Sequence, residues 1–150
     1  MKQSVKFLDR YLTVTGDEDA IAFLDITMTD ESVGTATGEI LKAVKQLQTY
    51  ASGEKIQFAL NLNPQGTAFQ KKVWQEMCKI PYGETKTYGD LAKAIGAPKA
   101  SRAVGGACHR NPISIVQPCH RVVGVKGLTG FLGGLDLKEK ILNFEKNPVR

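Results

Sequence analysis

The chain has 150 residues, of which 42% are hydrophobic and 23% charged, and its formal net charge is +5. This length allows one domain or two small units, and the composition supports a packed core and excludes a low-complexity disordered chain. No apolar run approaches the roughly 18 residues that a membrane span needs. Charged residues, beginning with Lys2, interrupt the segment where the apolar core of a signal peptide would lie. We therefore expect a soluble cytoplasmic protein with no membrane partner.

Residues 1–66 predict a small unit with two strands, then a helix, then a third strand. Its expected strands either contain many residues that favour strands or alternate apolar with polar or small residues. Its expected helix carries apolar residues three or four positions apart. The expected ranges, in chain order, are 7–14 and 20–27 for the first strands, 37–51 for the helix and 56–62 for the third strand. The cluster Asn63-Pro64-Gln65-Gly66 disfavours regular structure, so we expect a domain boundary there.

Residues 67–150 predict a mainly helical unit. Apolar spacing, a proline stop at Pro81 and a capping threonine at Thr87 indicate where its helices begin and end. The expected helices are 69–79, 88–95 and 99–108, and a short buried strand is expected at 113–116. The break Gly96-Ala97-Pro98 separates two short helices, which is the outline of a helix-turn-helix, although many such pairs are merely packed helices.

The charge is divided unevenly along the chain. Residues 1–66 carry six Lys and Arg against nine Asp and Glu, a net charge of −3, whereas residues 67–150 carry fourteen against six, a net charge of +8. A basic second half favours a polyanion such as nucleic acid as a partner. An ordinary basic surface would explain the same numbers, so charge nominates nucleic acid without establishing it.

The second short helix is built almost entirely from small residues with one arginine, Arg102. Two adjacent glycines, Gly105 and Gly106, disfavour a helix by roughly 0.5–1 kcal/mol each relative to alanine. They need a reason, and close approach of the backbone to another surface supplies one. That surface is either a neighbouring helix or the floor of a nucleic-acid groove, with Arg102 projecting into it.

Three cysteines at spacings that match no disulfide framework predict free thiols. Cys119 is followed by His120 and Arg121, and cations beside a thiol lower its pKa toward the thiolate form. The competing interpretation is an inert buried cysteine, the commoner fate of a free one. A second Cys-His pair at Cys108 raises the question of zinc, but the spacing fits no familiar site, so we expect no metal.

The segment Pro118-Cys119-His120-Arg121-Val122 resembles the active-site signature of the methylated-DNA–protein-cysteine methyltransferases, which repair 6-O-alkylguanine. The similarity extends over residues 69–145, and residues 1–66 resemble the family only in outline. Further matching motifs are Tyr88, residues 102–107, Asn111-Pro112, Gly133-Gly134 and Glu145. The resemblance implies an α+β fold, with a ribonuclease-like β-sheet lobe at 1–66 and a winged-helix-like alkyltransferase domain at 67–150.

The resemblance also implies a catalytic role for each matching residue. Cys119 would accept the alkyl group in one displacement, and the neutral thioether product leaves water no easy route to regenerate the thiol. One protein would therefore repair one lesion, without a cofactor. His120 would act on the thiol through a water, Glu145 would orient the imidazole, and Tyr88 would donate a hydrogen bond to the departing base. Read locally, Glu145 could equally be a solvated carboxylate at a helix end.

The implied partner is double-stranded DNA containing 6-O-alkylguanine or 4-O-alkylthymine, bound through its minor groove by a monomer, with cooperative binding left open. The target base must leave the stack to reach a thiol. Arg102 would fill the vacated space, and the DNA-contacting residues would be Tyr88, Arg102, Ala103 and Gly105. The substrate pocket would be lined by Asn111, Val122, Phe131, Leu132 and Gly133.

Two departures from the family pattern bear on alkyl-size preference and rate. Phe131 stands where many relatives have tyrosine, and Leu132 occupies a position that is usually small or polar. Three other functions remain open: a lesion binder without transfer activity, a cysteine hydrolase and a plain winged-helix DNA-binding module. The thiol of Cys119 argues against the first and third, and a hydrolase would turn over repeatedly on esters or peptides.

Overall fold

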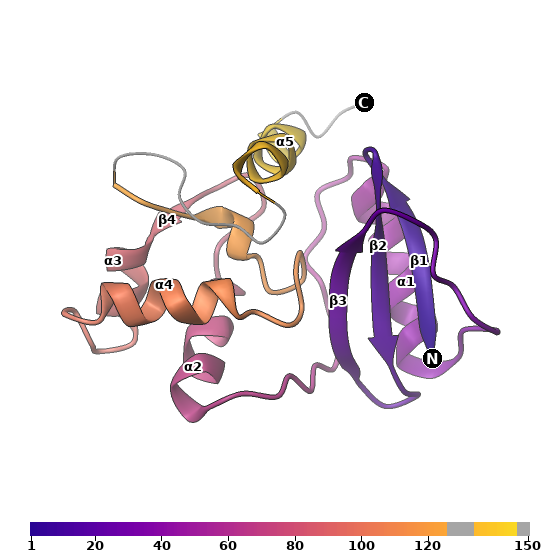
Figure 1. The fold of residues 1–150 in the computed structure, drawn as a ribbon, viewed down its shortest axis with the longest axis horizontal. Coiled ribbons are helices and arrows are strands. Elements are labelled where there is room, and N and C mark those ends of the chain that lie inside the picture. Colours follow the sequence, from indigo (N-terminus) through magenta and orange to yellow (C-terminus); the bar gives the residue numbers. More distant parts are fainter. Residues whose placement is uncertain (126–133, 147–150) are drawn as a thin grey trace. The chain divides into compact units, whose positions relative to one another are not determined.

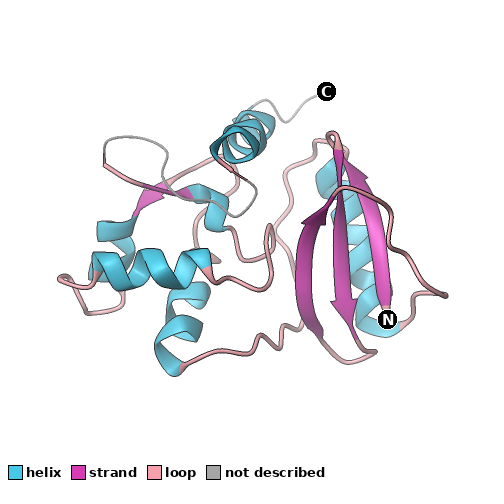
Figure 2. Cartoon of the chain, viewed as in Figure 1, coloured by secondary structure: helices cyan, strands magenta, loops and turns pink. Residues whose placement is uncertain are grey.

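The computed structural model describes residues 1–125 and 134–146 and divides them into two compact units. The first comprises Met1–Gln65 with Pro112–Ser114, and the second comprises the described residues of Gly66–Asn111 and Ile115–Lys146. Longer strands occur in the first unit and most helices in the second (Figure 2), which confirms the α+β class. Within the described ranges, no helix is long and apolar enough to cross a bilayer.

An antiparallel sheet with strand order β1-β2-β3 forms the centre of the first unit. Its strands are β1 (Lys2–Phe7), β2 (Arg10–Gly16) and β3 (Ile21–Thr27). The strand predicted at 7–14 is confirmed from Arg10 onward as part of β2, but its start is wrong, because the chain reverses at Leu8 and pairs Phe7 with Arg10. Leu8 takes the left-handed value φ 53°. Asp9 is the turn-favouring residue there, but a leucine is not expected at positive φ, so the reversal was missed.

Helix α1 (Gly38–Ala51) covers one face of this sheet, as Figure 1 shows. Ile40, Ala43, Leu47 and Tyr50 recur at helical spacing and are all fully buried, so they form the apolar face that the sequence predicted. Against them lie strand residues such as Leu12. Burial of this face makes the helix stable in a lobe of only about 65 residues.

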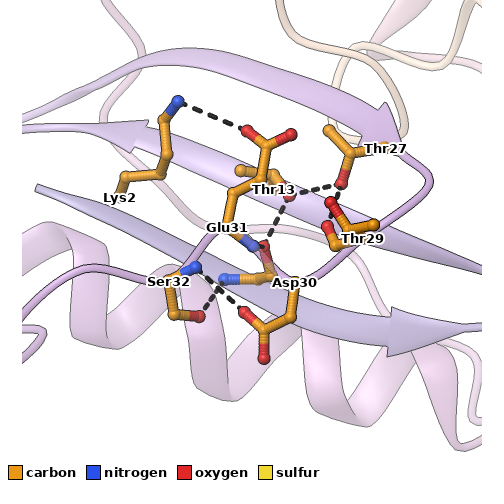
Figure 3. A network of polar contacts seen from close by, with 8 residues as sticks. Lys2, Thr13, Thr27, Thr29, Asp30, Glu31 and Ser32 are labelled. Atoms are coloured by element: carbon orange, nitrogen blue, oxygen red, sulfur yellow. Dashed lines mark hydrogen bonds and ion pairs between the residues drawn. The ribbon is translucent and has the colours of Figure 1, made fainter.

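Polar contacts hold the segment after β3 against the sheet (Figure 3). Thr13 alternates with the core residues of β2, and its hydroxyl lies 2.7 Å from that of Ser4 and 2.8 Å from that of Thr27. The amide of Glu31 donates to the Ser4 hydroxyl over 2.8 Å, and that of Ser32 donates to a nearby carboxylate. This segment is therefore held by hydrogen bonds rather than by a second apolar core.

The segment at 56–62 shows the predicted alternation of half-buried and exposed side chains but forms no strand. The side chain of Gln46 on α1 bonds both the amide and the carbonyl of Ala59, which occupies the groups that a strand would pair. The segment meets the sheet in an isolated bridge at Ile21, whose amide donates to the Asn61 carbonyl over 2.8 Å and whose carbonyl accepts from the Asn63 amide over 2.7 Å. The alternating sequence of residues 56–62 correctly predicted which side chains are half-buried. Whether the segment pairs as a strand depended on Gln46 of α1, which is distant in sequence.

Residues Pro112–Ser114 belong to the first unit because they pair with the edge of β3. The amide of Leu24 donates to the carbonyl of Pro112, and the amide of Ser114 donates to the carbonyl of Leu24, both over 3.0 Å. The predicted strand at 113–116 is wrong beyond this bridge, because Ile115 takes φ 70° and turns the chain. A β-branched residue at positive φ is rare, since its side chain is crowded there.

The second unit packs its helices around one apolar cluster. Its described elements, in chain order, are α2 (Ala68–Met77), β4 (Lys86–Thr87), α3 (Tyr88–Ala94), α4 (Ser101–His109), the 3₁₀ turn η1 (Cys119–Arg121), β5 (Val122–Val123) and α5 (Leu135–Lys146). The three predicted helices are confirmed within two residues at each end. Thr67 and Thr87 each form a capping box, and the Trp74 indole donates to the Ala107 carbonyl over 2.8 Å, joining α2 to α4.

Candidate active site

Cys119 begins the 3₁₀ turn η1 and is partly exposed. Its amide donates to the carbonyl of Gln117 over 2.8 Å, and the parallel pairing of β5 with β4 follows directly after the turn. Cys119 packs against the margin of the helical core, as Tyr88 also does. These contacts fix Cys119 at the margin of the core, with part of the residue exposed.

Burial raises the pKa of the Cys119 thiol, so the prediction of a lowered pKa is wrong for this structure. Desolvation penalises the thiolate more than the neighbours stabilise it. A hydrogen bond from the Asn111 side chain and the positive charge of Lys138 do act to lower the pKa. The Arg121 guanidinium instead pairs with Glu145. The resting thiol is therefore protonated, and it needs a base before it can act as a nucleophile.

The base nearest in sequence, His120, is fully buried and bound to a carboxylate. Its Nε2 lies 2.6 Å from Oε2 of Glu145. Because a carboxylate only accepts, Nε2 carries the hydrogen, and Nδ1 of the neutral ring then has a free electron pair. Burial also lowers the pKa of His120, which favours that neutral ring. Within the described residues, Nδ1 has no hydrogen-bond partner.

Glu145 lies on α5 and is 1% exposed, so the alternative of a solvated helix-end carboxylate is wrong. Its two oxygens accept from the His120 ring, from Nε and Nη2 of Arg121 over 2.8 and 3.0 Å, and from the Gly83 amide over 3.2 Å. Although burial opposes ionisation, these donors hold the pKa of Glu145 well below its usual range. The carboxylate is therefore charged and fixed in place, as orienting a neighbouring imidazole requires.

Lys138 is a residue of this site that sequence reasoning missed. It lies one turn into α5 and is fully buried, and its Nζ donates to the Val122 carbonyl over 2.6 Å. Nζ also lies 6.0 Å from the centre of the Tyr88 ring. Its positive charge lowers the thiol pKa of Cys119. No local pattern marks such a lysine; only its apolar neighbours in α5, Leu137 and Ile141, hinted that the helix is half-buried.

Tyr88 begins α3 and is partly buried against the core. A Cβ added to Gly105 would lie 3.8 Å from the Tyr88 ring. This is an ordinary van der Waals distance, so the tyrosine packs against Gly105 without requiring a glycine there. On α4, the helix that contains Gly105, the side chains of Arg102 and Ala103 are exposed. The residues predicted to contact DNA thus lie on α4 and at the first residue of α3.

A hollow of about 590 Å³ lies between α4 and the start of α2. Three cations line it, Lys99, Arg102 and Arg110, together with small residues of α4 such as Gly106. No carboxylate is among its lining residues. A smooth, positively charged surface of this kind suits the phosphates and sugars of a nucleic-acid backbone.

The structure describes two of the five residues predicted for the substrate pocket. The Val122 side chain is fully buried in the core, and its carbonyl is occupied by Lys138, so any contact with a substrate would come from its backbone. Asn111 is buried next to the thiol. Phe131, Leu132 and Gly133 lie outside the described residues.

The other cysteines have no features of a reactive site. Burial raises the pKa of Cys78 to about 11 and that of Cys108 to about 12, and the Cys108 thiol contacts the sulfur of Met77. In the parts of the chain that the structure describes, no three His, Cys, Asp or Glu side chains gather as metal ligands would. Cys119 differs from both in directly preceding His120 and in receiving a hydrogen bond from the buried Asn111 side chain.

Comparison with known proteins agrees with this geometry. The sequence model of the family "6-O-methylguanine DNA methyltransferase, DNA binding domain" matches residues 68–147. The chain is 45% identical over 141 residues to the methylated-DNA–protein-cysteine methyltransferase of Methanosarcina acetivorans, covering 89% of this chain and 90% of that one. The corresponding protein of Methanosarcina barkeri is 54% identical over 110 residues, covering 73% of this chain and 70% of that one.

A solved structure shows the same fold. That of Mycobacterium tuberculosis OGT in complex with DNA has a TM-score of 0.84 and 40% identity, and the match covers 97% of this chain and 92% of that one. Fold and site together define a DNA-binding α+β enzyme with a reactive cysteine. The chain belongs to the methylated-DNA–protein-cysteine methyltransferase family, and its function is DNA repair by alkyl transfer.

Proposed function

We propose that this protein removes the alkyl group of 6-O-alkylguanine in double-stranded DNA, irreversibly, onto Cys119. The observation that carries the proposal is the arrangement of a partly exposed thiol followed directly by a neutral, carboxylate-bound imidazole. A thiolate is a soft nucleophile suited to a saturated carbon. The thioether product has no good leaving group, so each molecule reacts once.

The proton and electron pair can be followed through the proposed step. His120 takes the thiol proton, through a water, on the nitrogen that has no partner among the described residues. The sulfur then bonds to the alkyl carbon as the bond from that carbon to guanine O6 breaks, and the electron pair leaves with the guanine. Tyr88 donates a hydrogen bond to the departing base, and the proton taken from the thiol restores its neutral form. Lys138 stabilises the transient thiolate.

The alkyl group lies on the pairing edge of its base, so the nucleotide has to leave the stack before reaction. We propose that Arg102 enters the duplex at the vacated position while the small residues of α4 lie in the minor groove. Arg102 is exposed next to the exposed Ala103, which supports this role. 4-O-Alkylthymine carries the same alkyl ether and is proposed as a second substrate. A cytoplasmic monomer acting on DNA is likewise proposed.

The test of this function is the mass of the protein after incubation with DNA that contains 6-O-methylguanine. We expect a gain of one methyl group per molecule, located on Cys119 by peptide mapping, and no further reaction with fresh DNA. Cys78 and Cys108 serve as internal controls because they are free thiols of the same protein that the proposal does not assign as acceptors. Multiple turnovers, or label on either control thiol, would contradict the proposal and favour a hydrolase or nonspecific alkylation.

Replacing Arg102 with alanine should separate base extraction from chemistry. Extrusion of a base costs a few kcal/mol, so we expect Arg102→Ala to slow repair of duplex DNA by about tenfold. Its reaction with free 6-O-benzylguanine should change less than twofold, because that base needs no extraction. Lys93→Ala, which removes one exposed charge from α3, controls for the loss of charge. Equal losses on both substrates would rule out a role in extrusion.

A further inference from the structure

A buried pair of amide side chains lies beside the reactive cysteine. Gln117 stands two residues before Cys119 and is 3% exposed, and Asn111 is 4% exposed. Nε2 of Gln117 donates to Oδ1 of Asn111 over 2.8 Å, while Nδ2 of Asn111 donates to the Gln117 carbonyl over 2.7 Å. The two residues therefore contact each other at both ends of the Asn111 carboxamide.

The same carboxamide reaches the reactive sulfur. The Asn111 side chain hydrogen-bonds Cys119, and only its NH2 group can donate. The NH2 group must then face both the sulfur and the Gln117 carbonyl, which leaves the oxygen on the other side. That oxygen is the atom that Nε2 of Gln117 contacts. A carboxamide turned by half a rotation would place its oxygen against the Gln117 carbonyl and its NH2 against the Gln117 side-chain donor.

We propose that Gln117 is a positioning residue for alkyl transfer, because its side-chain amide fixes the orientation in which Asn111 donates to the Cys119 sulfur. The biological meaning of this role rests on the proposed function. Gln117 acts through Asn111 and does not touch the reacting atoms. Its effect is largest once the thiol has lost its proton, since a hydrogen bond to a charged acceptor is about twice as strong as one to a neutral acceptor.

The backbone of Gln117 fits the same role. Its carbonyl accepts from the Cys119 amide over 2.8 Å as well as from Asn111, so one residue links the donor to the nucleophile. Ile115, two residues upstream, takes φ 70°. The loop thus turns sharply into the segment that brings Gln117 against Asn111. Burial of both amides means that water cannot replace a lost partner without rearrangement.

The experiment measures the thiol itself and needs no DNA. We would prepare Gln117→Met, which keeps the length of the side chain but cannot donate, and Gln117→Glu, which keeps the shape and only accepts when ionised. The readout is the pH profile of iodoacetamide alkylation at Cys119, followed by the mass of its peptide. Losing a hydrogen bond to a charged group should move the midpoint up by about one pH unit. The rate below the midpoint then falls about tenfold in both variants, and methyl transfer falls in parallel.

Two controls separate positioning from packing. On an Asn111→Ala background, Gln117→Met should cause no further shift, because the residue through which Gln117 acts is gone. Val116→Ala, a buried apolar change in the same loop, should lower stability and leave the midpoint unchanged.

An unshifted midpoint in both Gln117 variants would overturn the proposal, as would a full shift on the Asn111→Ala background or in Val116→Ala. Loss of folding in both Gln117 variants would assign the pair a purely structural role and overturn it too. Because iodoacetamide reports on the thiol alone, absence of methyl transfer in the wild-type protein would contradict the proposed function without touching this result.

Discussion

Cys119→Ser is expected to abolish alkyl transfer, with a rate at least about 1,000-fold below that of the wild-type protein. A serine hydroxyl has a far higher pKa than a thiol and is a poor nucleophile toward a saturated carbon. The substitution changes one atom at a partly exposed position, so folding and DNA affinity should be largely retained. Transfer is measured by methyl incorporation from 6-O-methylguanine DNA, and affinity by titration of the same duplex.

Cys78→Ser is the matched control, because Cys78 is also a free thiol of the second unit. It should retain full transfer activity. If Cys119→Ser loses its fold, as shown by circular dichroism, the cysteine is structural and the assignment of the nucleophile fails. Retained transfer in Cys119→Ser would point to another acceptor, which peptide mapping would identify.

The second large effect is expected from Glu145→Gln, which should destabilise the protein by about 3–5 kcal/mol at pH 7. The variant leaves the Arg121 guanidinium buried without its anionic partner and removes a charge that four donors surround. Transfer should slow as well, since the His120 ring loses the group that orients it. Urea unfolding of both proteins measures the change in free energy of unfolding.

The same variant has a predictable dependence on pH. The pKa of Glu145 is lowered in the folded protein, so the stability it contributes is present above the ordinary Glu pKa and is lost as pH falls through the acid range below it. The difference between wild type and Glu145→Gln should therefore shrink between about pH 5 and pH 3. Glu139→Gln, an exposed change on the same helix, should show neither effect. A pH-independent difference would refute the charge-pairing account.

The helices of the second unit were predictable because their signals are local. Thr87 caps α3 through contacts with a residue only three positions away, and Gly96 with φ 78° follows its end. The turn at Leu8 and the fate of residues 56–62 were not predictable. The first takes a backbone conformation that leucine rarely adopts, and the second depends on a side chain of α1.

The residues of the candidate site also fall into those that the sequence indicated and those that it did not. The motif around Cys119, together with its resemblance to a repair family, was enough to nominate the thiol, His120 and Glu145. Lys138 and Gln117 were missed, since a lysine in a helix and a glutamine in a loop look ordinary until their partners are known. Phe131 and Leu132, the departures that bear on alkyl size, lie outside the described residues and stay predictions.

What the sequence determined by itself was the helical framework and the positive charge that suits DNA, and it also supplied Cys119 as the proposed nucleophile. Only the tertiary structure decided the direction in which the pKa of the Cys119 thiol moves, which is upward. Hydrogen bonds within a helix or a cap join residues a few positions apart, so a short stretch of sequence specifies them. The pKa of Cys119 depends instead on desolvation and on charges and donors brought through space from Lys138 and Asn111, and no short stretch contains them.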